Sequence, residues 1–214
     1  MEALAIALRN QILDGRLSAG DVLRENALCA EFGVSRHSMR VALASLGHEG
    51  LVRHEANRGV FVRGLTADEI EDCFRMRRLL ELDAAQAICG DHAALTPARA
   101  IAGQMTALST GSVWTELRDL DLAFHTALVD ALGSGHMSRA YRAMLSELQL
   151  CFLIEGFKDL DHERVAKEHM TMLEALESGN LAHSQRLLHE HLVLSERDAV
   201  TALTRSAQPQ PTVR

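Results

Sequence analysis

Apolar residues recur along most of this chain at the spacing expected for one face of an α-helix. In the first part, Leu4, Leu8 and Ile12 predict a helix over about residues 2–14. Two shorter helices are predicted over about 25–32 and 36–48, each followed by a glycine that ends it. Two β-type segments come next, Leu51–Arg53 and Val60–Val62, on either side of a loop.

After Gly64 the strand-like pattern ends, and all the remaining apolar periodicity is helical. Breaks at Gly, Pro, Ser and Asn positions divide this part into six predicted helices, near residues 66–89, 97–110, 113–132, 136–155, 161–177 and 181–203. The predicted fold class is mainly α, with a small helix-and-strand domain over 1–64 and an all-helical bundle over 65–205. Residues 206–214 are polar and contain proline, so we expect a disordered tail.

The segment Leu28–Leu46 has the layout of a helix-turn-helix. Gly33 turns the chain between two short helices, and Ser35 is the predicted N-cap of the second helix. Arg36 and Arg40 then lie on the leading turns of that helix, where side chains can reach base edges in the major groove. Two arginines on an isolated helix are more often ordinary solvated charges, but here the turn and the β segments that follow favour DNA binding.

The loop between the two β segments predicts a wing. Its tip carries Arg58 and Gly59; the arginine can enter the minor groove, and the glycine lets the backbone approach closely. The first domain is therefore interpreted as a winged helix-turn-helix.

Charge at first argues against nucleic acid, because the whole chain has a net charge of -7. The charge is unevenly distributed, however: residues 1–64 hold 8 arginines against 7 acidic residues. A slightly basic module on an acidic body can bind phosphates, and binds them better when two copies act together.

The run GDVLRENALCAEFGVSRHSMRVALASLGHEGLVRHEANRGVFV resembles the winged helix-turn-helix of GntR-type transcriptional regulators. In that family the arginines of the recognition helix contact DNA, which implies this role for Arg36 and Arg40. Some members carry a third arginine where this chain has Asn26, and a Thr-Pro where it has His37-Ser38. These departures suggest a different operator preference. The predicted DNA-contacting residues are Arg24, Asn26, Ser35, Arg36, His37, Arg40, Arg58 and Gly59.

Four potential metal ligands fall on apolar faces of three different predicted helices. Asp121 and His125 are four residues apart and share one face. His169 lies among apolar residues, and in the last helix His191, rather than His189, shares its face with leucines. A lone inward histidine is more often a hydrogen-bonded core residue, but a buried carboxylate needs a partner or a cation. Together, one carboxylate and three imidazoles suit Zn²⁺, Ni²⁺, Mn²⁺ or Fe²⁺.

The pattern D-x-x-x-H, then E-H-x-x-x-L-E-A-L, then His-Leu resembles the FCD ligand-binding domain of one GntR subgroup. In that subgroup an Asp and three His bind a divalent metal, and the resemblance assigns this role to the same four residues. Arg77 of R-R-L-L-E is the candidate anion-binding arginine; the alternative is a surface ion pair with Glu81 or Glu71. His136 stands where the family usually has Asn, and is a second candidate for contacting an effector.

These features predict a ligand-responsive transcriptional regulator, a repressor by analogy with most of the family. The expected partners are a second copy of the chain, a roughly palindromic double-stranded operator and a small carboxylate effector. Two alternatives stay open: the metal is purely structural or is itself the signal, or the metal site belongs to an enzyme. Against an enzyme, no general base beside the metal is evident.

Nothing in the sequence predicts a membrane or secreted protein. No run of about 18 apolar residues occurs, and the first residues lack the basic and apolar regions of a signal peptide. The 4 cysteines are scattered, as in a reducing compartment. We therefore expect a cytoplasmic protein without membrane contact.

Overall fold

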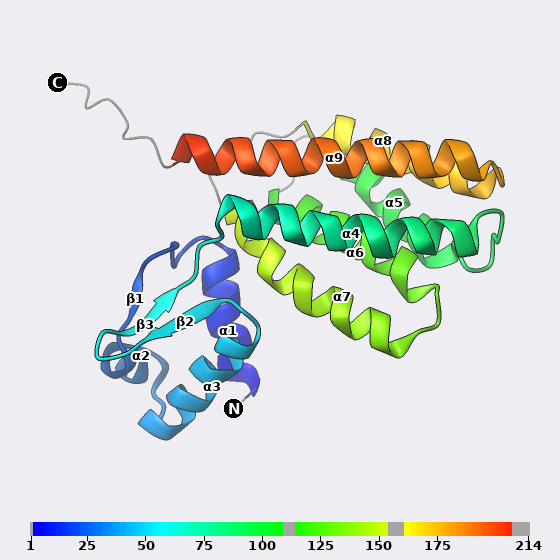
Figure 1. Cartoon of the computed structure of the whole chain (residues 1–214). Helices are drawn as coiled ribbons and strands as arrows, with labels where there is room; N and C mark the ends of the chain where they lie inside the picture. Colours follow the sequence, from blue (N-terminus) through cyan, green and yellow to red (C-terminus); the bar gives the residue numbers. More distant parts are fainter. Residues whose placement is uncertain (1, 109–113, 154–160, 207–214) are drawn as a thin grey trace. The chain divides into compact units, whose positions relative to one another are not determined.

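The computed structural model describes residues 2–108, 114–153 and 161–206 (Figure 1). The chain divides into two compact units, Met1–Thr66 with Ser146–Ile154, and Ala67–Leu145 with Glu155–Arg214. The domain limits expected from the sequence, 1–64 and 65–205, stay predictions. The mainly helical character expected from the periodicity is confirmed by the elements of both units.

In the first unit, short helices pack together beside a small antiparallel sheet. The helices α1 and α3 contact each other, and apolar side chains of both, such as Leu8, Ile12 and Leu43, are fully buried. The sheet has the strand order β1–β3–β2, and Glu55 pairs with Gly59 at the turn between its last two strands. The elements are α1 (Glu2–Leu13), β1 (Val22–Leu23), α2 (Glu25–Phe32), α3 (Arg36–His48), β2 (Val52–Glu55) and β3 (Gly59–Val62).

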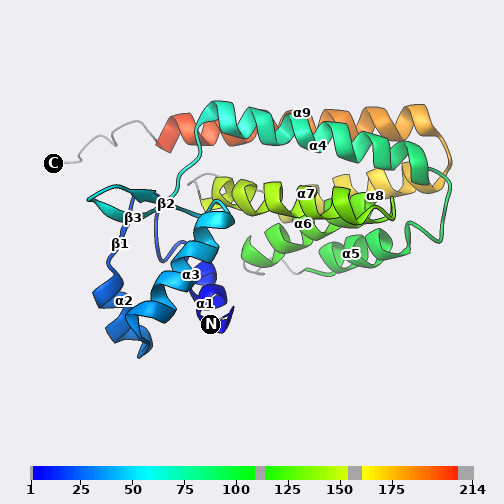
Figure 2. The same cartoon turned by 60° about the horizontal axis from the view of Figure 1, so that its bottom comes forward.

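The second unit is a bundle of helices. In Figures 1 and 2, α4 and α9 lie side by side, and α9 also packs on α8. A continuous apolar core joins α4, α5, α6, α8 and α9 through residues such as Ala84, Ala102, Phe124, Leu173 and Leu192. The elements are α4 (Ala67–Ile88), α5 (Thr96–Ala107), α6 (Trp114–Asp130), α7 (Gly135–Leu148), α8 (His162–Glu177) and α9 (Leu181–Ser206).

Three expectations from the sequence differ from the observed secondary structure. β1 was not predicted, because two residues are too few to show alternation; it forms by pairing with β3. The predicted helix over 136–155 is wrong over 149–153, where the chain tightens into a 3₁₀ helix, η1 (Gln149–Leu153), and residues 154–155 lie outside the described part. The expected disordered tail is wrong at Ser206, which ends α9, and residues 207–214 lie outside the described part.

The described helices include none that combines the length and the apolar character needed to cross a bilayer.

Candidate DNA-binding surface and metal centre

The N-terminal end of α3 displays its predicted DNA-contacting side chains to solvent. Ser35 caps the helix as predicted, because its Oγ accepts a hydrogen bond from the Ser38 N–H at 3.1 Å. Arg36, His37 and Arg40 are exposed, whereas the opposite face of α3 is buried. The helix is therefore anchored by its apolar face and leaves a basic face open, the arrangement that reading the major groove requires.

Arg40 is not free on this surface. Its Nε lies 2.9 Å from a Glu25 carboxylate oxygen at the start of α2, and the Arg40 side chain is 68% exposed. Arg24 and Asn26, on either side of that glutamate, are exposed as well. Exposed ion pairs contribute little free energy, so DNA phosphates or base edges can compete with Glu25 for Arg40.

The β2–β3 hairpin forms the predicted wing. Arg58, 71% exposed, pairs with Glu55 at 2.5 Å and lies over the Phe61 ring. Asn57 (φ 62°) and Gly59 (φ 110°) adopt positive φ angles, so the turn is sharp and holds Arg58 at its tip. All the side chains predicted to meet DNA are thus displayed in the first unit.

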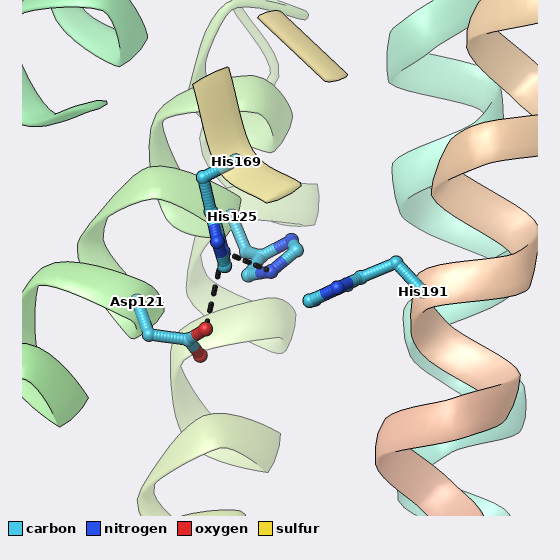
Figure 3. Close-up of side chains that lie close together, drawn as sticks. All are labelled: Asp121, His125, His169 and His191. Carbon is cyan, nitrogen blue, oxygen red and sulfur yellow. Dashed lines mark hydrogen bonds and ion pairs between the residues drawn. The ribbon is translucent and has the colours of Figure 1, made fainter. Parts of the chain in front are cut away.

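The four predicted metal ligands come together inside the second unit. Asp121 and His125 on α6, His169 on α8 and His191 on α9 point toward one another (Figure 3), with one ligand atom of each within 4.8 Å of the others. His169 Nε2 lies 3.1 Å from Asp121 Oδ1 and 3.3 Å from His125 Nε2. Neighbouring ligands of an ion with bonds of roughly 2.1 Å have such separations.

Two of these histidines have their other ring nitrogen already engaged. His125 Nδ1 lies 2.6 Å from Glu81 Oε2, and His169 Nδ1 lies 2.8 Å from the Val165 carbonyl oxygen. Because carbonyls and ionised carboxylates only accept, both Nδ1 atoms carry the proton and donate. Nε2 is therefore the ring nitrogen that each of these two histidines turns toward the other and toward the Asp121 carboxylate. With Nδ1 engaged elsewhere, each ring has only Nε2 left to ligate an ion, so the donor set fits a metal cation.

Burial lowers the pKa of two imidazoles in this cluster. Burial lowers the pKa of His125 to about 4, although Glu81 acts in the opposite direction, and burial also lowers the pKa of His191. Burial alone would raise the pKa of Asp121, but its hydrogen bond and charge interaction with His169 outweigh this and hold it below its usual range. Neutral imidazoles beside an ionised carboxylate are the forms that bind a metal.

Comparison with known proteins assigns both units. The family of bacterial regulatory proteins named gntR matches residues 1–62, and the FCD domain matches residues 72–194. The chain belongs to the GntR family of regulators and carries an FCD domain. This GntR protein is thus a DNA-binding transcriptional regulator and not an enzyme.

Individual relatives agree with this assignment. The regulator resembles the Nta operon transcriptional regulator of Aminobacter aminovorans (28% identity over 86% of this chain and 90% of the relative). It also resembles the gluconate operon transcriptional repressor of Bacillus subtilis (41% identity over 36% of this chain and 32% of the relative). A crystal structure from Rhodococcus sp. RHA1, assigned to the GntR transcriptional regulators, has a TM-score of 0.81 and 30% identity, covering 94% of this chain and 97% of that one.

The two predicted effector-contacting residues of the GntR regulator occupy different surroundings. Arg77 is only 2% exposed, and its Nε donates to Glu81 Oε1 at 2.8 Å. Arg77 therefore does pair with Glu81, but the ion pair is buried and does not lie on the surface, as the alternative expected. Arg77 Nη2 is buried, and no residue that the structure describes accepts a hydrogen bond from it. His136 is exposed at the start of α7, with its Nδ1 2.9 Å from Arg139 Nη2, and its role toward an effector stays a prediction.

Sequence reasoning did not single out Glu81 and Tyr141 as parts of this site. Glu81 is completely buried on α4 and accepts hydrogen bonds from Arg77, His125 and the Tyr141 hydroxyl, the last at 2.6 Å. One signal was present in the sequence: Glu81 lies on the same helix face as Phe74, Ala84 and Ala85, where an unpaired carboxylate would be costly. The single tyrosine of the chain gave no comparable signal.

Proposed function

We propose that this GntR regulator is a homodimeric repressor that releases its operator when a small carboxylate binds at a divalent metal in the FCD domain. The proposal depends above all on one observation, the convergence of Asp121, His125, His169 and His191 with one potential ligand atom of each facing the others. Zn²⁺, Ni²⁺, Mn²⁺ and Fe²⁺ are the candidate ions for this donor set. When bound, the ion would supply positive charge and coordination positions that the protein does not fill.

Arg77 supports a carboxylate as the second ligand. Its buried Nη2 lacks an acceptor, and a buried guanidinium donor left unpaired is costly unless a ligand supplies one. Arg77, Glu81 and Asp121 bring one positive and two negative charges to the cluster. A divalent ion would leave one excess positive charge, which a single carboxylate group neutralises. Sugar acids and short carboxylic acids, which carry such a group, are therefore the first classes to test.

The first unit would bind the operator through the displayed residues of α3 and the wing. Two copies place two recognition helices in successive major-groove turns, so we expect a roughly palindromic operator. Effector binding would change DNA affinity through a coupling free energy of about 1–3 kcal/mol between the two sites.

The number of protein ligands favours one competing function, in which the metal is structural or is itself the signal. Four protein donors can close a tetrahedral shell, as in structural zinc sites, and this would leave no position for an effector. In that case the metal would be structural, or its arrival would itself be the signal.

Thermal melting distinguishes these functions when it is combined with operator binding. The protein is loaded with Zn²⁺, Ni²⁺ or Mn²⁺, or stripped with a chelator, and screened against sugar acids and short carboxylic acids. We expect some acids to raise the melting temperature only when metal is present, and the same acids to release the operator in a gel-shift titration.

Other outcomes would contradict the effector. If the metal alone changes DNA affinity and no acid acts, the metal is the signal. If the metal raises the melting temperature but neither metal nor acid changes DNA affinity, the metal is structural.

A further inference from the structure

Glu81 of α4 is the meeting point of the buried polar groups around the metal centre. Its Oε1 accepts from Arg77 Nε at 2.8 Å and from the Tyr141 hydroxyl at 2.6 Å, and its Oε2 lies 2.6 Å from His125 Nδ1. Glu81 and His125 are completely shielded from solvent, and Arg77 is 2% exposed. A single carboxylate thus connects the candidate anion-binding arginine to one of the predicted metal ligands.

We propose that Glu81 is a positioning residue of the metal centre, which fixes His125 with its proton on Nδ1 and its bare Nε2 toward the other ligands. This inference rests on the proposed metal site. Arg77 can only donate, so Glu81 Oε1 is an acceptor, and the ion pair keeps the carboxylate charged. His125 must then donate from Nδ1, and a neutral imidazole with this proton has only Nε2 left for ligation.

The other two histidines are held differently. His169 Nδ1 donates to a backbone carbonyl, that of Val165, which no substitution at position 165 removes. His191 Nδ1 lies 3.5 Å from Glu168 Oε2, too far for a short hydrogen bond. Among the described residues outside the four predicted ligands, Glu81 is therefore the one side chain that fixes a ligand through a short hydrogen bond to its ring nitrogen.

The substitution Glu81→Gln tests this assignment sharply. Arg77 and Tyr141 both donate to the same atom of residue 81, so the glutamine will keep its carbonyl oxygen there. Its NH₂ group then faces His125 Nδ1, which must accept, and the proton of His125 moves to Nε2, the atom that faces the centre. The size and shape of the side chain are almost unchanged.

Two readouts follow. Nitrogen-15 NMR of the metal-free protein should show the His125 proton on Nδ1 in the wild type and on Nε2 in Glu81→Gln. Competition with a chelator should show that the variant binds Zn²⁺ about 10- to 100-fold more weakly, as expected when an outer hydrogen-bond partner is lost. Circular dichroism of both proteins checks that the variant is folded.

Tyr141→Phe is the matched control. It removes one hydrogen bond to Glu81 but leaves the contact between Glu81 and His125, so the proton should stay on Nδ1 and Zn²⁺ affinity should change less than threefold. The inference is overturned if Glu81→Gln binds Zn²⁺ like the wild type with the proton still on Nδ1, or if Tyr141→Phe weakens Zn²⁺ equally. Failure of the wild type to bind any of the candidate ions would instead overturn the proposed function, and the inference with it.

Discussion

His125 Nε2 and His169 Nε2 lie 3.3 Å apart in a buried site, and each ring donates its proton in the opposite direction, one to Glu81 and one to Val165. The protein thus turns two Nε2 atoms toward each other, with the Asp121 carboxylate 3.1 Å from His169 Nε2. This arrangement gathers two imidazole nitrogens and a carboxylate at the distances that ligands of one cation have.

Removing the carboxylate of this cluster should weaken metal binding strongly. We expect Asp121→Asn, which keeps the size but not the charge of the ligand, to lower Zn²⁺ affinity by a factor on the order of 100 or more. The wild type should gain about 2.7 kcal/mol of stability at a metal concentration 100 times Kd, and the variant much less. The control is His189→Asn on the exposed face of α9; equal loss of metal binding in that variant would remove the assignment.

The metal-free protein should lose stability in mild acid. Burial holds the pKa of folded His125 at about 4 against an ordinary 6.5, so the unfolded chain binds more protons between these values. The free energy of unfolding should therefore fall as the pH decreases from about 6.5 to about 4, by at most about 3 kcal/mol from this group. Urea titrations in chelator at several pH values measure it. In His125→Asn the free energy of unfolding should decrease less over the same pH range. If it decreases as steeply as in the wild type, His125 is not the source of the pH dependence.

The ion pair between Arg40 and Glu25 predicts a gain of DNA affinity from a surface change. Glu25→Gln frees the Arg40 guanidinium and removes a negative charge from the DNA-facing side, so operator affinity should rise a few-fold. Arg36→Ala should instead lower operator affinity by about 1–3 kcal/mol. Fluorescence anisotropy with operator and random DNA at two salt concentrations measures both variants. Weaker operator binding by Glu25→Gln would show that the glutamate helps to place Arg40.

Two glycines should respond to alanine with opposite signs. A Cβ at Gly59 in the wing meets no atom within 4 Å, but φ is +110°, so Gly59→Ala should cost about 1 kcal/mol from backbone strain alone. Gly103 lies exposed inside α5, also with free space, and Gly103→Ala should stabilise the protein by about 0.5–1 kcal/mol. Urea denaturation compares them; a stabilising Gly59→Ala would contradict the observed turn.

The helices and the four converging ligands followed from the sequence because both depend on local periodicity. Asp121 and His125 share a helix face by spacing alone, and the apolar neighbours of His169 and His191 show which way those rings point. Knowing that a residue points inward does not give its partner. The meeting of Glu81, Tyr141 and His125 depends on how α4, α6 and α7 rotate against one another, which is set by packing over the whole bundle. β1 escaped prediction for the same reason, since it exists only through its pairing with β3.

A substitution at Arg77 should weaken carboxylate binding while leaving metal binding nearly unchanged. Arg77→Lys keeps a positive charge beside Glu81 but loses the planar fork of donors, including the unpaired Nη2. We expect the variant to bind Zn²⁺ within a few-fold of the wild type, while any carboxylate that stabilises the metal-loaded wild type stabilises the variant at least tenfold more weakly. Melting curves with metal, with and without the acid, measure this difference. Arg78→Lys on the same helix, whose partner is Glu196, is the matched control and should respond like the wild type. If Arg77→Lys keeps the full response to the acid, the unpaired donor is not the carboxylate site; if the variant loses the metal as well, Arg77 supports the metal ligands and does not hold the effector.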